Sequence, residues 1–368
     1  MAAATWTLSG CRHRIAPGVI GPTTSTLDRC SLPPVHVSPD REIRTIVGLR
    51  PHRPGGFVVR AEKIGETLVV HNYGHGGGGI TLSWGTSKLA VDLGAPGHTG
   101  TVAVLGCGAV GLATGRLLQE AGLRVTIYAK DLPPNTTSNV AGGQWFPFSV
   151  FDPGHETPEF MEQFVKASAF SYNRYQTMQG ARYAVRWMRN YFLANRAWRE
   201  NGLLGLQGPL HPFMPELRDL RPEEHPFTGY QYVRQFDSML IEPPIYLNAL
   251  VQDFRQAGGE VVVRDFQDVS SVQALKLPLV FNCTGLGAKA LFGDAELVPV
   301  RGQLTFLLPQ PEVDYATIPE DLYMFPRSDG ILLGGTHETG NWSLAPDDET
   351  KQRILARHKT IFENMRRC

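Results

Sequence analysis

The sequence has 368 residues, of which 42% are hydrophobic, and this is enough to form one large domain or two modest ones. Thirty-five basic residues balance thirty-five acidic ones, which excludes the basic footprint of a nucleic-acid-binding protein, and no apolar run reaches the roughly eighteen residues of a membrane helix. The five cysteines (Cys11, Cys30, Cys107, Cys283 and Cys368) are scattered without a C-x-x-C pair, so we expect no metal site, no disulfide framework and a reducing, cytoplasmic location.

Residues 1–30 differ from the rest of the chain. They hold three arginines and a single acid, Asp28, and show no hydrophobic periodicity. The arginines would suit a transit peptide, but the apolar stretch of a signal sequence is missing and Pro-Gly pairs interrupt the segment. We therefore expect a disordered extension rather than a targeting sequence.

The next elements form the pattern of a nucleotide-binding unit. Residues 57–70 alternate like two short strands around a turn at Gly65, and residues 81–93 predict a helix that ends at Gly94. The apolar run "TVAVLG" that starts at Thr101 is typical of a buried parallel strand. A helix that stops at Gly122 and the strand "RVTIYAKD" follow it, which completes a βαβ unit.

The second half of the chain predicts a mixture of helices and strands. Residues 157–198 are rich in aromatic residues and are expected to be helical, and we expect Phe160, Phe164 and Phe170 to pack in a core rather than to bind a cofactor. The remaining predicted elements are a helix over 243–259 and strands over 260–265, 277–285, 301–308 and 330–336.

The segment after Leu105 carries the first of two glycine loops. Gly106, Gly108 and Gly111 form G-x-G-x-x-G between a strand and a helix, where the glycines allow a tight turn and a close approach of backbone to a pyrophosphate. Asp131, twenty residues after Gly111, is placed to bind ribose hydroxyls, which argues against NADP. This loop predicts a dinucleotide but does not distinguish NAD from FAD.

The second glycine loop, "GHGGGGIT", precedes the first. A turn rich in glycine that leads into a helix at Thr81 directs several N–H groups and a helix dipole toward an acceptor or a negative charge. A reduced flavin develops negative charge at N1 and at its C2 carbonyl, so this loop favours FAD. The alternative for such a composition is an ordinary flexible loop.

Eight motifs of the chain match one family. They are "VLGCGAVG", "TTSNVAGGQWFPF", "MLIEPPIYL", "FNCTGLGAKALFGD", "PVRGQ", "YMFPRSDGILLGGTHETGNW", "GLRPHRPG" and "HNYGHGGGGITLSWG". Through them the sequence resembles the D-amino-acid oxidase family of FAD enzymes, which also contains D-aspartate oxidases. The resemblance implies an α/β fold, in which a FAD-binding Rossmann-like domain joins a substrate domain built on a mainly antiparallel sheet. It also implies oxidation of D-amino acids to imino and 2-oxo acids, with reduction of oxygen to hydrogen peroxide.

The order of these motifs differs from that of the family. "GLRP" and "HNYGHGG" normally close such a chain, whereas here they precede the dinucleotide loop. We interpret this as a circular permutation, with the old ends joined through residues 94–100 and the new ends near Ser31 and Cys368. The helix after one loop leaves the cofactor and the strand before the other approaches it, so seven residues can join them. Both loops would then hold one FAD, at its isoalloxazine and at its pyrophosphate.

The resemblance also implies a division into domains. The FAD-binding domain would comprise residues 54–147 and 238–294. The substrate-binding domain would comprise residues 31–53, 148–237 and 295–368, with residues 1–30 as the extension.

Three residues match the family's substrate contacts. Arg50 in "GLRP" matches the arginine whose planar guanidinium pairs with the substrate carboxylate, and Tyr323, eleven residues before Gly334, matches a tyrosine that donates to the same group. Gly77 matches the position whose carbonyl accepts from the substrate amine. Taken alone, the arginine would be a surface charge and the tyrosine a packing residue. The other residues expected at the substrate pocket are Gln144, Trp145, Phe325 and His337.

A larger set matches the family's cofactor contacts, namely the two loops, the ribose and phosphate contacts, and the chain beside the flavin ring. These residues are Gly76, Gly77, Gly79, Ile80, Thr81, Gly106, Gly108, Ala109, Val110, Gly111, Lys130, Asp131, Thr136, Thr137, Ser138, Gly143, Gln144, Trp145, Cys283, Thr284 and Gly285.

The sequence departs from the family at three places. The acid of the second strand is Asp131, whereas the family often has it at the position of Lys130, which leaves the adenosine contacts open. The segment of residues 307–321 is shorter than the lid of the mammalian members of the family, which suggests a more open site. His337 stands where D-aspartate oxidases have an arginine, so we do not expect a strict preference for acidic substrates; a structural histidine is the alternative.

Two other functions compete with a D-amino-acid oxidase. One is another FAD amine oxidase, such as a glycine or sarcosine oxidase or a dehydrogenase, and the other is a flavin-binding protein without catalysis. The spacing of Arg50 and Tyr323 argues against the first, and the presence of both carboxylate ligands argues against the second. The expected partners are a D-amino acid and oxygen, without nucleic acid or membrane, and the resemblance admits a homodimer.

Overall fold

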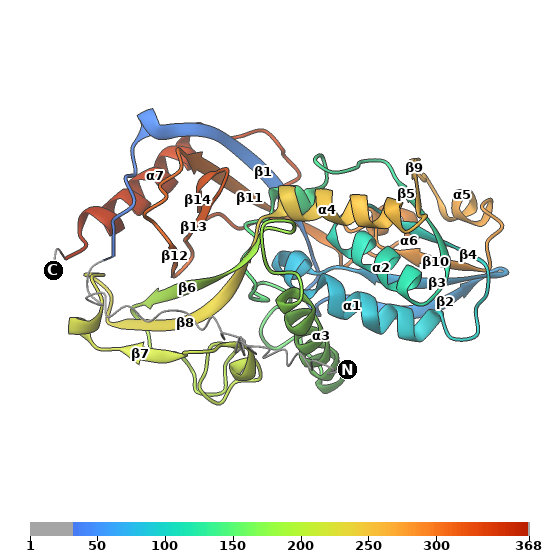
Figure 1. The fold of residues 1–368 in the computed structure, drawn as a ribbon, viewed down its shortest axis with the longest axis horizontal. Helices are drawn as coiled ribbons and strands as arrows, with labels where there is room; N and C mark the ends of the chain where they lie inside the picture. The colour runs from blue at the N-terminus through green and yellow to red at the C-terminus, as the bar shows by residue number, and fades with distance from the viewer. Residues whose placement is uncertain (1–31, 367–368) are drawn as a thin grey trace, which may run out of the picture.

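The fold consists of two β-sheets with helices packed against them (Figure 1). It is described from a computed structural model, which covers residues 32–366. The extension predicted over residues 1–30 lies outside the described residues, and so do Ser31 and Cys368. The predicted α/β fold is confirmed, whereas the division into two domains stays a prediction.

The first sheet has six strands in the order β2-β3-β10-β4-β5-β9, and all neighbours are parallel except β2 and β3. The hairpin of β2 and β3 turns at Gly65, as predicted, with a positive φ of 61°. The strands are β2 (Val58–Ile64), β3 (Thr67–Tyr73), β4 (Thr101–Leu105), β5 (Arg124–Ala129), β9 (Glu260–Val263) and β10 (Leu279–Asn282). The interiors of β3, β4 and β10 are buried, which explains their continuous apolar runs.

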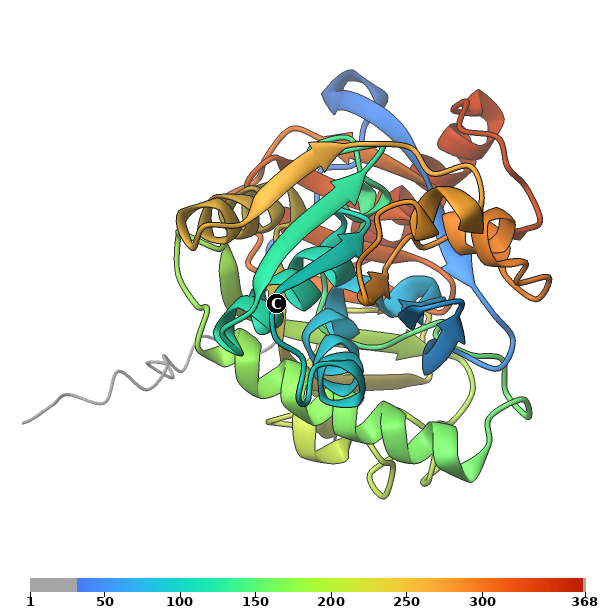
Figure 2. The ribbon, with the colours of Figure 1, turned by 90° about the vertical axis from the view of Figure 1, so that its right-hand side faces the viewer.

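Helices α1 (Gly79–Gly94), α2 (Ala109–Glu120) and α4 (Pro243–Gln256) pack against one another and the first sheet. Helix α3 (Pro158–Gln176) contacts α1, and Figure 2, which views the molecule from this end, shows it crossing α1 on the outside. Two short helices, α5 (Val269–Gln273) and α6 (Gly287–Phe292), flank β10. Of the helices within residues 32–366, none has the length and apolar character needed to cross a membrane.

The second sheet has nine strands and is mainly antiparallel, in the order β1-β11-β14-β13-β12-β6-β8-β7, with β15 beside β11. The one parallel pair along this path is β12 with β6. Its strands are β1 (Glu42–His52), β6 (Val185–Ala194), β7 (Arg218–Leu220), β8 (Tyr232–Ile241), β11 (Val298–Leu307), β12 (Tyr315–Pro319), β13 (Tyr323–Arg327), β14 (Gly330–Gly334) and β15 (Glu338–Thr339). Helix α7 (Asp348–Glu363) packs against this sheet.

One predicted element is wrong. Residues 157–198 were expected to be helical throughout, but the helix ends at Gln176 and residues 185–194 form strand β6. This strand pairs with β8 on one side and β12 on the other, so tertiary pairing decides its conformation. Helix α7 has no counterpart among the predicted elements, because few of its residues are buried (Thr350, Ile354, Leu355, His358 and Phe362) and its other faces are charged.

Candidate active site

A cavity of 1550 Å³ lies between the two sheets. The carboxyl ends of β3, β10, β4 and β5 form one wall, together with the first turns of α1 and α2, and the face of the nine-stranded sheet from β1 to β6 forms the other. Ligands of parallel sheets bind at these strand ends. The volume exceeds the roughly 300–1,000 Å³ of an ordinary small-molecule pocket, so it can hold an extended dinucleotide beside a small substrate.

The first glycine loop has the geometry of a pyrophosphate site. Gly106 has a φ of 106° at the end of β4, and a Cβ atom there would overlap the carbonyl oxygen of Cys283. A Cβ atom on Gly111 would overlap the Gly106 carbonyl, so Gly111 is required for packing although it does not line the cavity. The Ser138 hydroxyl accepts from the Ala109 N–H at 3.0 Å and joins the loop to residues 136–138. These residues fit the pyrophosphate of FAD at a helix N-terminus.

The second glycine loop forms a 3₁₀ turn, Gly76–Gly78, that leads directly into α1. The Gly77 N–H donates to the carbonyl of Ser149 at 2.9 Å, and a Cβ atom on Gly77 would lie 2.8 Å from the Phe148 carbonyl oxygen. The Thr81 hydroxyl lies 3.3 Å from the carbonyl oxygens of both Gln144 and Phe146. The start of α1 and residues 144–149 therefore run side by side along the cavity. The family resemblance predicts that the flavin ring lies beside Gln144 in this segment.

The part of the cavity at the carboxyl ends of β5 and β9 includes residues that were not predicted from the sequence. Lys130 and Asp131 line it as predicted, and Tyr128 and residues 264–267 line it beside them. Strand β9 is parallel to β5, so its carboxyl end reaches the same edge of the sheet. The predicted strand over 260–265 was the signal that could have placed residues 264–267 here.

Arg50 and Tyr323 meet at the other end of the cavity. The Arg50 guanidinium donates to the Tyr323 hydroxyl at 3.2 Å and to the Thr336 carbonyl at 3.3 Å. Both side chains are half-buried and line the cavity, and Arg50 keeps further N–H groups for a ligand. A planar guanidinium beside a phenol hydroxyl is suited to bind a carboxylate.

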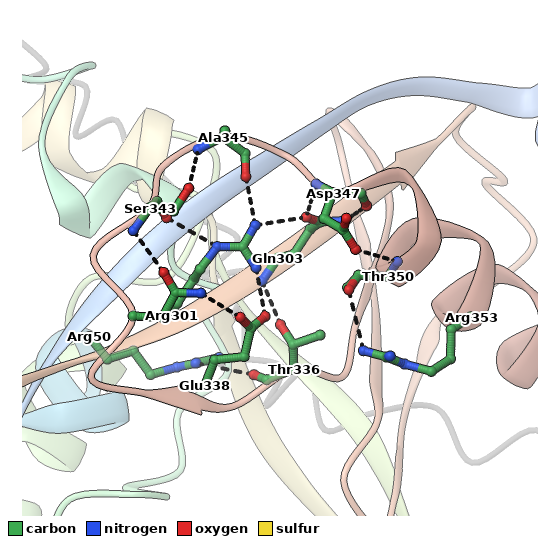
Figure 3. Close-up of polar contacts among 11 residues, drawn as sticks. Arg50, Arg301, Gln303, Thr336, Glu338, Ser343, Ala345, Asp347, Thr350 and Arg353 are labelled. Carbon is green, nitrogen blue, oxygen red and sulfur yellow. Dashed lines mark hydrogen bonds and ion pairs between the residues drawn. The ribbon is translucent and has the colours of Figure 1, made fainter.

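A buried network holds the backbone that contacts Arg50 (Figure 3). The Thr336 hydroxyl accepts from the Gln303 N–H at 2.7 Å, and the Gln303 carboxamide bonds both backbone groups of Asp347 at 2.8 Å. Arg301, which is 3% exposed, pairs with Glu338 at 2.6 Å and donates to the carbonyl groups of Ser343 and Ala345. The motif "PVRGQ" contains both Arg301 and Gln303, but the sequence did not reveal what they hold.

Aromatic side chains line the cavity near residues 144–149 and near the pair of Arg50 and Tyr323. The rings of Tyr323 and Phe325 stack with centroids 5.3 Å apart, and the rings of Phe146 and Phe148 lie 4.4 Å apart. These residues line the cavity together with Phe192, Trp198, Leu204 and Ile318, so the wall is mainly apolar.

His337 lines the cavity next to Thr336, and its side chain is only partly exposed. Partial burial lowers the pKa of His337, and the positive charges of Arg50 and His52 lower it further, although Asp152 opposes the shift. The ring is therefore mainly neutral at pH 7. The expectation that His337 gives no strict preference for acidic substrates stays a prediction.

Twenty-two of the residues predicted at the two sites line the cavity. They are Arg50, Gly76, Gly77, Gly79, Ile80, Gly106, Gly108, Ala109, Val110, Lys130, Asp131, Thr136, Thr137, Ser138, Gly143, Gln144, Cys283, Thr284, Gly285, Tyr323, Phe325 and His337. Gly111, Thr81 and Trp145 do not, and Thr81 uses its hydroxyl on backbone carbonyls as described above.

The placement of Trp145 in the substrate pocket is wrong. Gln144 and Phe146 line the cavity, whereas the side chain of the residue between them points away from it. The Trp145 side chain is fully buried against Tyr172 and Phe213, with ring centroids 5.0 and 5.9 Å away. Its backbone N–H donates to Met239, so Trp145 acts in packing.

Comparisons with known proteins show which family this chain resembles. The family model described as FAD dependent oxidoreductase matches residues 101–367. The chain is 32% identical to the D-amino-acid oxidase of Streptomyces coelicolor over 264 residues, which are 70% of this chain and 76% of the relative. It is 28% identical to the D-aspartate oxidase of Homo sapiens, over 70% of this chain and 75% of the relative. Among solved structures, glycine oxidase from Geobacillus kaustophilus shares the fold, with a TM-score of 0.56 and 16% identity over 72% of this chain and 78% of that one.

Proposed function

Since this chain belongs to the FAD-dependent oxidoreductase family, we propose that it oxidises D-amino acids to imino acids and transfers the electrons to oxygen. The imino acid hydrolyses to a 2-oxo acid and ammonia, and oxygen becomes hydrogen peroxide. The observation that carries this proposal is the meeting of Arg50 and Tyr323 at one end of a cavity whose other parts carry two glycine loops.

FAD, when bound, would supply the hydride acceptor. The chain's own residues orient the substrate. Arg50 and Tyr323 hold its carboxylate, and the Gly77 carbonyl, at the start of α1, accepts a hydrogen bond from its amino group. Two fixed points on either side of Cα restrict its rotation and so fix the direction of the Cα–H bond.

No side chain is needed to remove the amine proton if the substrate binds as a neutral amine. His75 lies beside Gly76, but burial lowers its pKa to about 3 and its Nε2 is 2.8 Å from the Thr86 hydroxyl. His75 is therefore neutral, and its Nε2 atom already has a hydrogen-bond partner. Catalysis on this proposal comes from orientation and from the apolar wall, which excludes water.

The proposal is tested by the visible flavin band. The purified protein, saturated with FAD, is mixed without oxygen with D-alanine, D-phenylalanine and their L-enantiomers. Bleaching by the D-enantiomers alone, followed by hydrogen peroxide when air is admitted, is the expected result. Bleaching by glycine or sarcosine alone would replace the proposal by a glycine- or sarcosine-oxidase activity. A spectrum that no amine changes would reject an amine oxidase altogether.

We also propose that the chain is a circular permutation of the family's usual order. The family model begins at Thr101, the first residue of β4, and the preceding α1 ends at Gly94. Gly97 and Gly100 in the connection have positive φ and no atom near a Cβ position, as in an open linker. Near the two ends of the described chain, the Tyr315 hydroxyl donates to the Pro33 carbonyl at 2.7 Å and lies 4.0 Å from the Met365 sulfur, so residues 33 and 365 lie close together.

A reordered chain tests the permutation. It would start at Thr101, join Arg366 to Leu32 by a short linker and end at Gly94, and it should fold and bind FAD. A reordered chain that cannot do so would count against this proposal.

A further inference from the structure

The backbone segment that contains Gln144 is held by contacts with both walls of the cavity, through α1 on one side and β13 on the other. The Thr81 hydroxyl contacts its carbonyl from the start of α1. Two residues earlier, a Cβ atom on Gly142 would lie 2.8 Å from the Phe325 ring, so this segment also presses against β13. Gln144 is half-buried and lines the same cavity as Gly77, Tyr323 and Phe325.

The hydrogen bonds of Asn190 determine which way the Gln144 carboxamide points. Asn190 Nδ2 donates to the Met188 carbonyl at 2.9 Å, and because a carbonyl can only accept, Asn190 must direct its oxygen elsewhere. That oxygen accepts from Gln144 Nε2 at 2.6 Å. Gln144 Oε1 is therefore the free end of the chain of bonds, and it has no hydrogen-bond donor among residues 32–366.

Asn190 itself is 1% exposed and belongs to strand β6. The residues on either side of it along this face, Met188 and Phe192, belong to the apolar core under the cavity. A buried amide in such a place is stable only when its hydrogen bonds are made. Asn190 makes them to one backbone carbonyl and to Gln144, so its position in the core serves the orientation of Gln144.

We propose that Gln144 Oε1 is a second acceptor for the amino group of the substrate, and that Asn190 is the positioning residue that holds it. The inference rests on the proposed function, since it assumes a carboxylate at Arg50 and Tyr323. An amino group on the adjacent carbon would then lie on the α1 side, between the Gly77 carbonyl and Gln144. Two acceptors match the two N–H groups of a neutral amine and fix the rotation of Cα.

Binding of two aromatic carboxylates tests the proposal without turnover. Benzoate offers only a carboxylate, whereas anthranilate adds an amino group, and either can be followed by the change it causes in the flavin spectrum. In Gln144→Met, which keeps the length of the side chain, we expect anthranilate to bind about tenfold more weakly and benzoate to change less than about twofold. Asn190→Leu should weaken anthranilate in the same selective way but by less, because the freed carboxamide can still rotate its oxygen toward the amine.

Thr317→Val is the matched control, since the Thr317 hydroxyl is also buried in this sheet, on the strand beside β6, and has no partner among the described residues. It should leave both dissociation constants unchanged. Equal losses for benzoate and anthranilate in Gln144→Met, or no loss for either, would overturn the role of Gln144. A wild-type protein that binds FAD but neither carboxylate would instead overturn the carboxylate site, and with it the proposed function. If Asn190→Leu does not fold, Gln144→Met alone still decides the question.

Discussion

The guanidinium of Arg50 lies 3.2 Å from the hydroxyl of Tyr323, although 273 positions separate the two residues in the chain. Two strands, β11 and β14, lie between β1 and β13 in the sheet. Each of these two strands has a glycine next to the contact between Arg50 and Tyr323. A Cβ atom on Gly302 would lie 2.6 Å from Arg50 Nη1, and one on Gly334 would overlap the Tyr323 ring. The absence of two side chains leaves the space in which Arg50 and Tyr323 meet.

Arg50→Ala is expected to lower kcat/KM for D-alanine by about a thousandfold or more. A charge-assisted bidentate contact contributes roughly 1.5–3 kcal/mol to binding, and a misplaced Cα can add about a hundredfold in rate. Steady-state kinetics measure the loss, and the flavin spectrum should not change, because Arg50 does not hold the cofactor. Arg50→Lys should recover only part of the activity, since an ammonium has no planar fork. Near-normal turnover by Arg50→Ala would remove Arg50 from the substrate site.

Tyr323→Phe should cost about tenfold in kcat/KM, the effect of one lost hydrogen bond. The ring itself should stay in place, because its stacking on Phe325 does not involve the hydroxyl. Kinetics with the same substrate provide the measurement. A loss as large as that of Arg50→Ala would show that the hydroxyl does more than donate to the carboxylate.

Gly302→Ala should impair the carboxylate site while the fold remains intact. The new methyl group would meet the Arg50 guanidinium, which is the flexible end of a side chain and can move away. We therefore expect benzoate binding to weaken by about tenfold or more, with a melting temperature within a few degrees of wild type. Gly55→Ala, at a turn outside the cavity where a Cβ atom would meet no atom closer than 4.0 Å, is the control for a glycine substitution outside the site. Unchanged benzoate affinity in Gly302→Ala would contradict the packing described above.

FAD is expected to bind without a covalent link. Cys107 and His75 lie in the two glycine loops, but burial raises the pKa of the Cys107 thiol to about 12, so it is not a reactive thiolate. The Nε2 atom of His75 is already engaged with Thr86. Precipitation with acid should leave all the yellow colour in the supernatant. Colour that remains in the pellet would reveal a covalent bond.

The stability of the protein should fall as the pH drops below about 6.5, in part because of His358. This residue is fully buried in α7 and contacts the Gly334 carbonyl at 3.1 Å, and burial lowers its pKa to about 4. The unfolded state therefore binds a proton at higher pH than the folded state, so this contribution is complete above about pH 6.5 and is lost progressively down to about pH 4.

Urea unfolding at pH 7 and pH 5 measures this effect. His358→Gln keeps a donor for the Gly334 carbonyl but does not titrate, and its free energy of unfolding should fall by about 2 kcal/mol less than that of wild type between these pH values. His155→Gln replaces an exposed histidine and should follow the wild type. An equal pH dependence of wild type and His358→Gln would exclude His358 as a source of acid lability.

The sequence by itself determined the parts of this protein that depend on local geometry. The strand at Thr101, the loop with Gly106 and the helix after it are specified within a short segment by an apolar run, by a turn that requires a positive φ, and by helical periodicity. The second glycine loop and α1 are local in the same sense. Such patterns were sufficient to predict a dinucleotide site, and with the family motifs to predict FAD.

Tertiary structure decided everything that depends on which strands become neighbours. Strand β6 appeared helical from its sequence, because only its pairing with β8 and β12 makes it extended. The side of the chain on which Trp145 lies, the cavity residues at the end of β9, and the bond from Asn190 to Gln144 follow from contacts between distant segments. The family motifs named Arg50 and Tyr323, but their meeting depends on the register of four strands and on Gly302 and Gly334 between them. No short stretch of sequence contains that information, because strand pairing is a property of the whole sheet.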